Sequence, residues 1–217
     1  MVTQEEKFLV FECFDEGTGF LRNSLRIFEE ESLVCETIGA TYSEQLFEKP
    51  FELSEEAITR LSKKYGVEIR PGECWGTLRR PFMVDLLPYD VHTNREFELM
   101  QRGLKPMSVF SESLHANQDR LESISTSFRP HVESSRFAER RYTRLPSGNE
   151  DASRSAISMI LVARKAEEWR IDAYILAIAC ADQAGWGEGF ERLEGHLLGY
   201  ESWQTDAYLK LKKNKPV

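Results

Sequence analysis

Residues 7–28 read KFLVFECFDEGTGFLRNSLRIF, and this stretch decides the fold expected for the N-terminal part of the chain. The first eight residues are rich in aromatic side chains, which favour strands. The next five contain two glycines, which supply the positive φ angles of a tight turn. In the last nine, apolar Leu21, Leu25 and Ile27 alternate with polar residues, the pattern of a strand with one buried face. The stretch therefore predicts two strands joined by a turn.

A third strand is predicted over 32–41, directly after a charged tip formed by Glu29, Glu30 and Glu31. Apolar residues within 32–41 fall on one face of an extended chain, as a strand requires. Three strands in succession predict an antiparallel β-meander.

The clearest short helix is expected over 54–66. Ser54 is a suitable N-cap, two glutamates occupy the first turn, two lysines occupy the last, and Gly66 suits a left-handed stop. Residues 67–90 are rich in proline and glycine, which predicts a loop with a short strand at 82–87.

A capping box at Thr93 and Glu96 predicts a helix that ends at Gly103. A short strand is then expected over 107–111, and a helix over 112–125.

Residues 123–155 are rich in Ser, Arg and Pro, which predicts a long, mobile loop. From about residue 152 the pattern becomes helical. Shorter helices are expected over 188–198 and 202–212. The longest predicted helix carries an apolar stripe at spacings of four and three, formed by Val162, Ala166, Trp169, Ala173, Leu176 and Cys180.

The predicted fold class is therefore α+β, with an N-terminal antiparallel β-meander and short helices followed by a helical C-terminal half. The corresponding organisation is a mixed α/β region over 1–122, a Ser/Arg-rich loop or linker over 123–151 and a helical region over 152–217. One domain containing all three is the alternative.

The 217 residues carry a formal net charge of −8, and the negative charge is unevenly distributed. Residues 1–56 hold fourteen acidic and four basic side chains, a net of −10, whereas the remainder holds 22 and 24, a net of +2. Such asymmetry marks either an interaction surface or a solvated face.

The longest apolar run, 173–181, is too short for a membrane span, which takes about 20 residues. The N-terminus is acidic, unlike a signal peptide, so we expect a cytoplasmic protein.

The four cysteines are Cys13, Cys35, Cys74 and Cys180. None belongs to a Cys-x-x-Cys pair or has a histidine at a zinc spacing, so free thiols are expected in a reducing compartment. The sequence predicts neither a metal site nor a cofactor.

Four residues are weak catalytic candidates: Asp85, Asp90, His92 and Glu96. Carboxylates and an imidazole supply metal ligands and acid–base groups. The competing interpretation is that these residues are helix caps and surface charges.

A second group is a candidate anion site, formed by Arg136, Arg140, Arg141 and Arg144. Guanidinium groups bind phosphate and carboxylate in a bidentate manner. The alternative is that these arginines dock on the acidic N-terminal region of the same chain or keep a loop soluble.

Trp203 lies beside Tyr200 at a predicted helix start, where a half-exposed ring would anchor a protein partner. Packing in the core is the alternative. We interpret Glu29, Glu30 and Glu31 in the same way, as a partner-binding surface.

These observations favour a protein-binding accessory protein, such as an immunity protein, an antitoxin or an inhibitor. Its acidic N-terminal surface would recognise a basic protein partner, because acidic patches steer association with basic proteins. The alternative is an enzyme acting on a phosphorylated or nucleic-acid substrate. In that enzyme the arginines would bind phosphate, and the Asp, His and Glu candidates would supply metal binding or acid–base catalysis. The overall acidity disfavours nucleic acid as a partner, and we expect no membrane partner.

Overall fold

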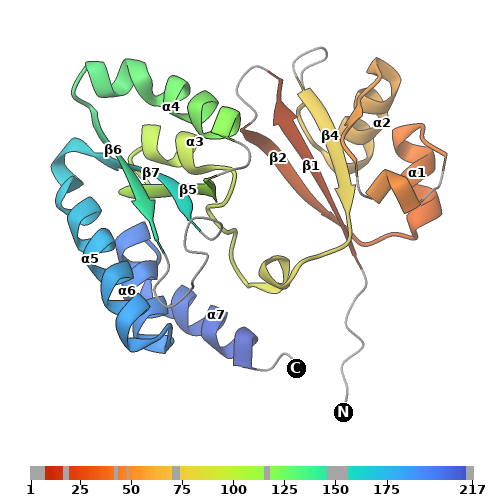
Figure 1. Ribbon diagram of the computed structural model, residues 1–217. Coiled ribbons are helices and arrows are strands. Elements are labelled where there is room, and N and C mark those ends of the chain that lie inside the picture. The colour runs from red at the N-terminus through yellow and green to blue at the C-terminus, as the bar shows by residue number, and fades with distance from the viewer. Residues whose placement is uncertain are drawn as a thin grey trace. The chain divides into compact units, whose positions relative to one another are not determined.

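The computed structural model describes residues 8–16, 20–41, 44–47, 49–69, 74–114, 118–145 and 156–213, without the side chains at 44, 45 and 74. The chain divides into two compact units, Met1–Leu86 and Leu87–Val217. We call them the N-terminal unit and the C-terminal unit and describe each by itself (Figure 1).

The N-terminal unit is built on a four-stranded antiparallel sheet in the order β2-β1-β4-β3. The predicted pair of strands is confirmed, since β1 (Leu9–Asp15) pairs with β2 (Leu21–Ile27). The predicted alternation in β2 is also confirmed: Leu21 and Ile27 are buried, whereas the intervening arginines are exposed. Strands β4 (Cys74–Arg79) and β3 (Phe51–Glu52) complete the sheet.

The strand predicted over 32–41 is wrong, because this segment is helix α1 (Glu31–Ile38). Val34 and Ile38 are four residues apart, a spacing that fits one face of a strand and equally one face of a helix. Burial of the adjacent Val34 and Cys35 together identifies the helical face. The meander therefore has a helix where its third strand was expected, and β1 takes β4 as its second neighbour.

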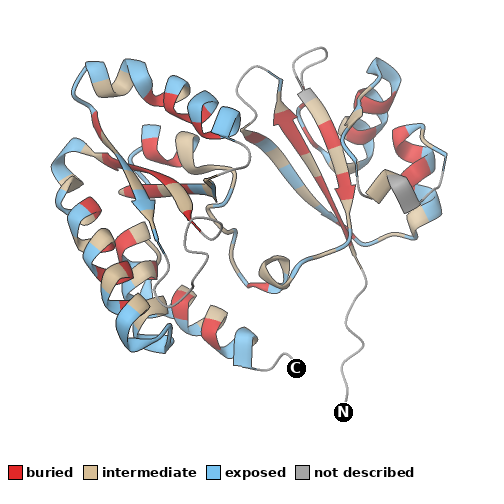
Figure 2. Cartoon of the chain, viewed as in Figure 1, coloured by how far each residue is buried: buried red, intermediate tan, exposed pale blue. Residues whose placement is uncertain are grey.

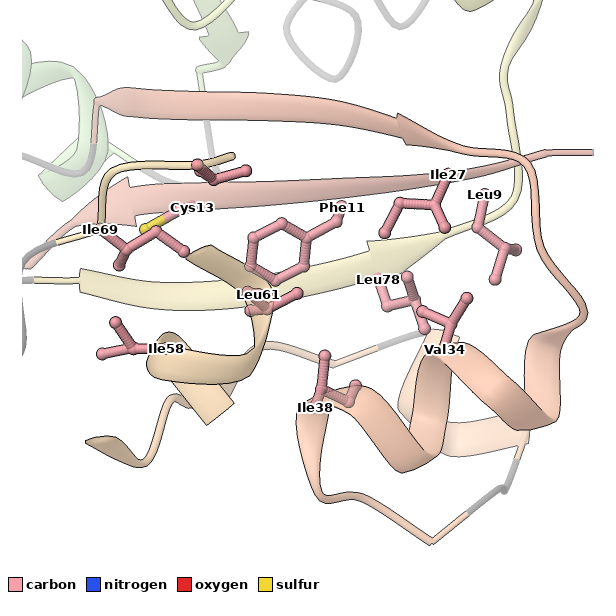
Figure 3. Close-up of a cluster of buried hydrophobic side chains, with 11 residues drawn as sticks. Leu9, Phe11, Cys13, Ile27, Val34, Ile38, Ile58, Leu61, Ile69 and Leu78 are labelled. Carbon is pink, nitrogen blue, oxygen red and sulfur yellow. The ribbon is translucent and has the colours of Figure 1, made fainter. Parts of the chain in front are cut away.

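Helix α2 (Glu55–Tyr65) begins and ends as the sequence predicted. The side chain of Ser54 accepts a hydrogen bond from the backbone N–H of Ala57, and Gly66 has a φ of 69°. Figure 3 shows the core of this unit, where apolar side chains of the sheet face those of α1 and α2. The central members of this cluster are Phe11, Ile27, Val34, Leu61 and Leu78.

The strand predicted at 82–87 is also wrong, since Met83–Leu86 is a 3₁₀ helix and the strand lies earlier, in β4. The lack of a side chain at Gly76 lets β4 lie close to the aromatic rings of its two neighbouring strands. A Cβ atom at this position would lie 3.2 Å from the ring of Phe11 and 3.2 Å from the ring of Phe51. A glycine inside a strand often marks such a close approach.

The C-terminal unit has a three-stranded antiparallel sheet in the order β5-β7-β6. Its strands are β5 (Met107–Ser113), β6 (Phe137–Arg144) and β7 (Ile157–Arg164). The strand predicted at 107–111 is therefore confirmed.

The long loop predicted over 123–155 is wrong wherever the structure describes it, except for short connections. Helix α4 (Gln118–Glu133) and β6 occupy most of 118–144. Four phenylalanines explain why this polar segment folds. Phe128 of α4 is fully buried and lies against the rings of Phe97, Phe110 and Phe137. Residues 146–155, the rest of the predicted loop, lie outside the described residues.

The long helix predicted from Val162 is two elements. Val162 lies in β7, a central strand with five consecutive buried residues, and α5 (Trp169–Ala184) begins only after a short 3₁₀ turn. A continuous apolar run is typical of a strand covered on both faces and resembles a buried helix in sequence. Trp169, a member of the predicted apolar stripe, is exposed.

Helix α3 (Glu96–Gln101) ends near Gly103 as expected, but its predicted capping box is absent. Its N-cap is Arg95 rather than Thr93, because Asn94 has a left-handed φ of 64° that turns the chain before the helix. The last two helices, α6 (Glu188–Leu198) and α7 (Ser202–Lys213), follow the prediction closely.

The fold class is α+β, with N-terminal strands in an antiparallel sheet, short helices and a mostly helical C-terminal half. Helices cover the sheet of each unit, and buried residues gather where they meet it (Figure 2). None of the helices in the described part of the chain is long and apolar enough to cross a membrane.

Candidate functional site

The N-terminal unit has an open depression of about 990 Å³ beside the start of α1. It is lined by Phe8, Leu9, residues 28–33, Arg80 and Pro81, and we call it the acidic depression. The three glutamates predicted to bind a partner, Glu29 to Glu31, all belong to its lining. Phe28 and Leu33 are 58% and 45% exposed, so apolar surface adjoins the carboxylates.

Two of these glutamates are held by cations of the same unit. Glu29 accepts hydrogen bonds from the Lys64 ammonium at 2.5 Å and from the Tyr65 hydroxyl at 3.0 Å. The hydrogen bond from Lys64 lowers the pKa of Glu29 and raises the pKa of Lys64. Glu31 pairs with the Arg80 guanidinium at 3.2 Å, whereas Glu30 is exposed at the N-cap of α1. The acidic tip is therefore ordered by its neighbours and still faces solvent at Glu30.

Asp85 belongs to an ion cluster in the same unit rather than to a reactive centre. Arg79 lies between two carboxylates, 2.6 Å from an oxygen of Asp85 and 2.9 Å from an oxygen of Glu12. Burial alone would lower the pKa of Arg79, but hydrogen bonds to Asp85 and Glu12 outweigh burial and raise it. Asp85 also accepts the backbone N–H of Phe82 at 2.6 Å. These contacts give Asp85 a structural role in holding the end of β4.

His92 and Glu96 lie near one buried lysine in the C-terminal unit. The His92 ring stacks on Tyr200 with centroids 4.2 Å apart, and its Nδ1 is 3.2 Å from the Nζ of Lys105. The Tyr200 hydroxyl accepts the backbone N–H of His92 at 2.9 Å. Lys105 is only 3% exposed and donates to the carbonyl of Leu198, in the last turn of α6, at 3.1 Å.

Burial sets the protonation of this cluster. It lowers the pKa of His92 to about 4, assisted by the charges of Lys105 and Arg95. It lowers the pKa of Lys105 to about 8, against the opposing attraction of Glu96, and raises the pKa of Glu96. A neutral imidazole and an ammonium group with a lowered pKa are chemically suited to proton transfer. In this cluster, however, they hold α6 against the segment before α3.

Asp90 is exposed at the surface, and a carboxylate oxygen of this residue lies 3.2 Å from the guanidinium of Arg95. Nowhere in the described ranges do three or more His, Cys, Asp or Glu side chains gather as a metal site would require.

The candidate anion-binding arginines are paired within the C-terminal unit. Because β6 is a strand, successive side chains point to opposite faces. Arg140 and Arg144 reach Asp172 and Asp182 of α5, whereas Arg141 reaches Glu122 of α4 at 2.7 Å.

Arg136 precedes β6, and its guanidinium lies 3.2 Å from Nδ1 of His131. The predicted alternative had the arginines dock on the acidic N-terminal region. Three of the four instead pair with carboxylates of the C-terminal unit, so that alternative is wrong for these three.

Trp203 is 49% exposed and lies edge-on to Tyr89, with ring centroids 5.4 Å apart. Its indole N–H donates to Glu201 at 3.1 Å. Half of this ring therefore remains available at the surface.

Of the cysteines, Cys13 and Cys35 are buried and Cys180 is exposed. The side chain of Cys74 lies outside the described residues.

Sequence reasoning missed the two cations that organise these sites, Arg79 and Lys105. A single lysine followed by proline carries no burial signal in the sequence. Arg79 gains Glu12 through the pairing of β1 with β4, and it gains Asp85 through the 3₁₀ helix that follows β4. Comparison of the chain with protein-family models, curated proteins and solved structures finds no match.

Proposed function

We propose that this protein is a binding protein that recognises a basic protein partner through the acidic depression. The observation that carries the proposal is that this depression combines three consecutive glutamates with exposed Phe28 and Leu33. Carboxylates supply attraction over a distance, and exposed aromatic and aliphatic groups supply the contact area that makes a complex persist.

The charge of the N-terminal unit supports this choice of partner. Residues 1–86 hold seventeen acidic and ten basic side chains, a net of −7, whereas residues 87–217 hold nineteen and eighteen, a net of −1. An excess of this kind raises the rate at which a basic surface is encountered. An immunity protein, an antitoxin or an inhibitor would act in this way by covering a basic partner.

The contacts of the other candidates favour the binding protein over the enzyme. Asp85 is occupied by Arg79 in the N-terminal unit, while His92 and Glu96 lie in the C-terminal unit. Three of the four arginines are paired with carboxylates. An enzyme that uses these groups stays the second candidate.

Two substitutions separate the parts of the proposed interface without disturbing the ion pairs of Glu29 and Glu31. Glu30→Lys reverses an exposed charge, and Phe28→Ala removes an exposed ring. Glu52→Lys is the matched control, because Glu52 is equally exposed in the same unit but outside the lining of the depression.

The experiment compares capture of proteins from the native host by the four forms, identifies the captured protein by mass spectrometry and then measures its binding kinetics. We expect Glu30→Lys to slow association about threefold to tenfold at low salt, and Phe28→Ala to speed dissociation by about tenfold or more. Glu52→Lys should retain the partner. Equal capture and kinetics for all four forms would overturn the proposal.

A further inference from the structure

The outward face of α5 exposes several apolar side chains. The exposed positions of this helix are Trp169, Asp172, Leu176, Cys180, Gln183 and Ala184. Within the described helix only Asp172 among them is charged, and it pairs with Arg140. A surface helix normally presents a charged or polar face to solvent. Trp169 and Leu176 are instead 53% and 64% exposed.

Four residues form a continuous stripe on this face: Trp169, Ala173, Leu176 and Cys180. Their spacings of four, three and four place them within an arc of about 60° on a helix with 3.6 residues per turn. The opposite face of α5 is already used, because Ile171, Tyr174 and Ile178 pack in the core of the C-terminal unit. The stripe therefore has the spacing of a helix–helix seam. Its Trp169, Leu176 and Cys180 are exposed, whereas Ala173 is partly buried against the core.

We propose that this stripe pairs with the same stripe of a second copy of the chain, with the two α5 helices antiparallel about a twofold axis. An axis midway between positions 174 and 175 places Trp169 opposite Cys180 of the second copy and Leu176 opposite its Ala173. Each large side chain then meets a small one, as close packing requires. A parallel arrangement places tryptophan on tryptophan and alanine on alanine.

Electrostatics favour the same arrangement. Antiparallel helices place the positive N-terminal end of each macrodipole beside the negative C-terminal end of the other. A twofold arrangement also closes the assembly at two copies, because each stripe is covered once.

The size of the stripe sets the strength of the dimer. From Trp169 to Cys180 the stripe is about 17 Å long at 1.5 Å per residue. Helix pairing of this length lies below the roughly 1,200 Å² of total area typical of stable interfaces. We therefore expect a reversible dimer with a Kd of about 10–100 μM.

The first experiment measures oligomeric state by sedimentation velocity over about 1–300 μM, a range that spans the expected Kd. Leu176→Glu places a charge in the centre of the stripe, and Leu104→Glu is the control, since Leu104 is 57% exposed on the same unit outside α5. We expect wild type and the control to dimerise and Leu176→Glu to weaken the dimer about tenfold or more. Circular dichroism checks that all three keep their helix content, which exposed positions allow.

The second experiment tests orientation by oxidative cross-linking of full-length protein carrying Cys74→Ser. Adding Trp169→Cys should let the introduced thiol reach Cys180 of the other copy, since disulfides require Cα atoms within about 7 Å. The Cys74→Ser protein alone should cross-link poorly, because antiparallel pairing separates the two Cys180 residues. Efficient cross-linking through Cys180 alone would overturn the antiparallel arrangement. A monomer throughout the concentration range, or a dimer unaffected by Leu176→Glu, would overturn the pairing itself. Neither result bears on partner binding by the N-terminal unit.

Discussion

His92→Gln should reduce the acid sensitivity of the C-terminal unit. Burial lowers the pKa of His92 from 6.5 to about 4 in the folded protein. The unfolded chain therefore binds a proton at this residue as the pH falls below about 6.5, whereas the folded chain does not until about pH 4. The stability that this pKa shift of His92 contributes is thus fully present near neutral pH and is lost as the pH falls from 6.5 to 4.

The size of this loss in the free energy of unfolding follows from the two pKa values of His92. A tenfold change in proton affinity corresponds to about 1.4 kcal/mol, so the full displacement is worth about 3 kcal/mol. The His92 ring is only partly shielded by Tyr200 and Lys105, which reduces the expected loss to about 2 kcal/mol between pH 7 and pH 4.5. The raised pKa of Glu96 acts in the opposite direction. Because Glu96 is present in both proteins, its contribution largely cancels when wild type and variant are compared.

The assay is urea unfolding at pH 7 and pH 4.5 in a Trp75→Phe background. The remaining tryptophans, Trp169, Trp186 and Trp203, all lie in the C-terminal unit, so their fluorescence reports this unit alone. At pH 7 the variant should lose about 0.5–1.5 kcal/mol of ring stacking on Tyr200. Its further loss of stability between pH 7 and pH 4.5 should then be about 2 kcal/mol smaller than that of wild type.

His196→Gln is the control, because His196 is exposed on α6. This control should keep the wild-type pH dependence. An equally steep loss of stability in His92→Gln and wild type would refute the assignment of this acid sensitivity to the His92 imidazole.

Three further substitutions test the packing of each unit by urea or thermal unfolding. Phe128→Ala should destabilise the C-terminal unit by about 3–5 kcal/mol, because it empties the space between three other phenylalanine rings; a loss below 1 kcal/mol would contradict this packing. Arg79→Met should destabilise the N-terminal unit by about 3–5 kcal/mol, since it leaves two largely buried carboxylates without their cation; an unchanged midpoint would count against the cluster. Gly199→Ala should cost about 2–4 kcal/mol, because a Cβ there would lie 2.3 Å from Cδ of Pro106 at a φ of 87°. Gly66→Ala, at a φ of 69° with open space around it, should cost only about 1 kcal/mol, and equal losses at both glycines would disprove the clash.

Local signals in the sequence correctly predicted those helices whose ends are marked by a capping residue or by a glycine in the left-handed conformation. Ser54 and Gly66 mark the ends of α2, and Gly199 marks the end of α6, because capping and left-handed stops depend on residues adjacent in sequence. The alternation in β2 was equally decisive, since one face of this strand is exposed.

Where several conformations suit the same local pattern, tertiary packing decided which secondary structure the segment adopts. Residues 32–41 suit a strand or a helix, and packing of Val34 and Ile38 against the sheet selected the helix. The polar segment 118–144 folds because Phe128 and Phe137 meet across the space between α4 and β6. Phe128 also meets Phe97 and Phe110, and Val34 packs against residues of the sheet, so most of these contacts join residues too far apart for a short local window.

The candidate sites show the same division. The sequence by itself determined the acidic excess of the N-terminal region, the glutamate tip and the apolar stripe of α5. Only the tertiary structure decided that the tip borders a depression, that the arginines of β6 are paired and that the stripe faces outward. Periodicity shows which residues of a helix share a face. Burial depends on which elements pack against that face, and for α5 the sheet covers the side defined by Ile171, Tyr174 and Ile178.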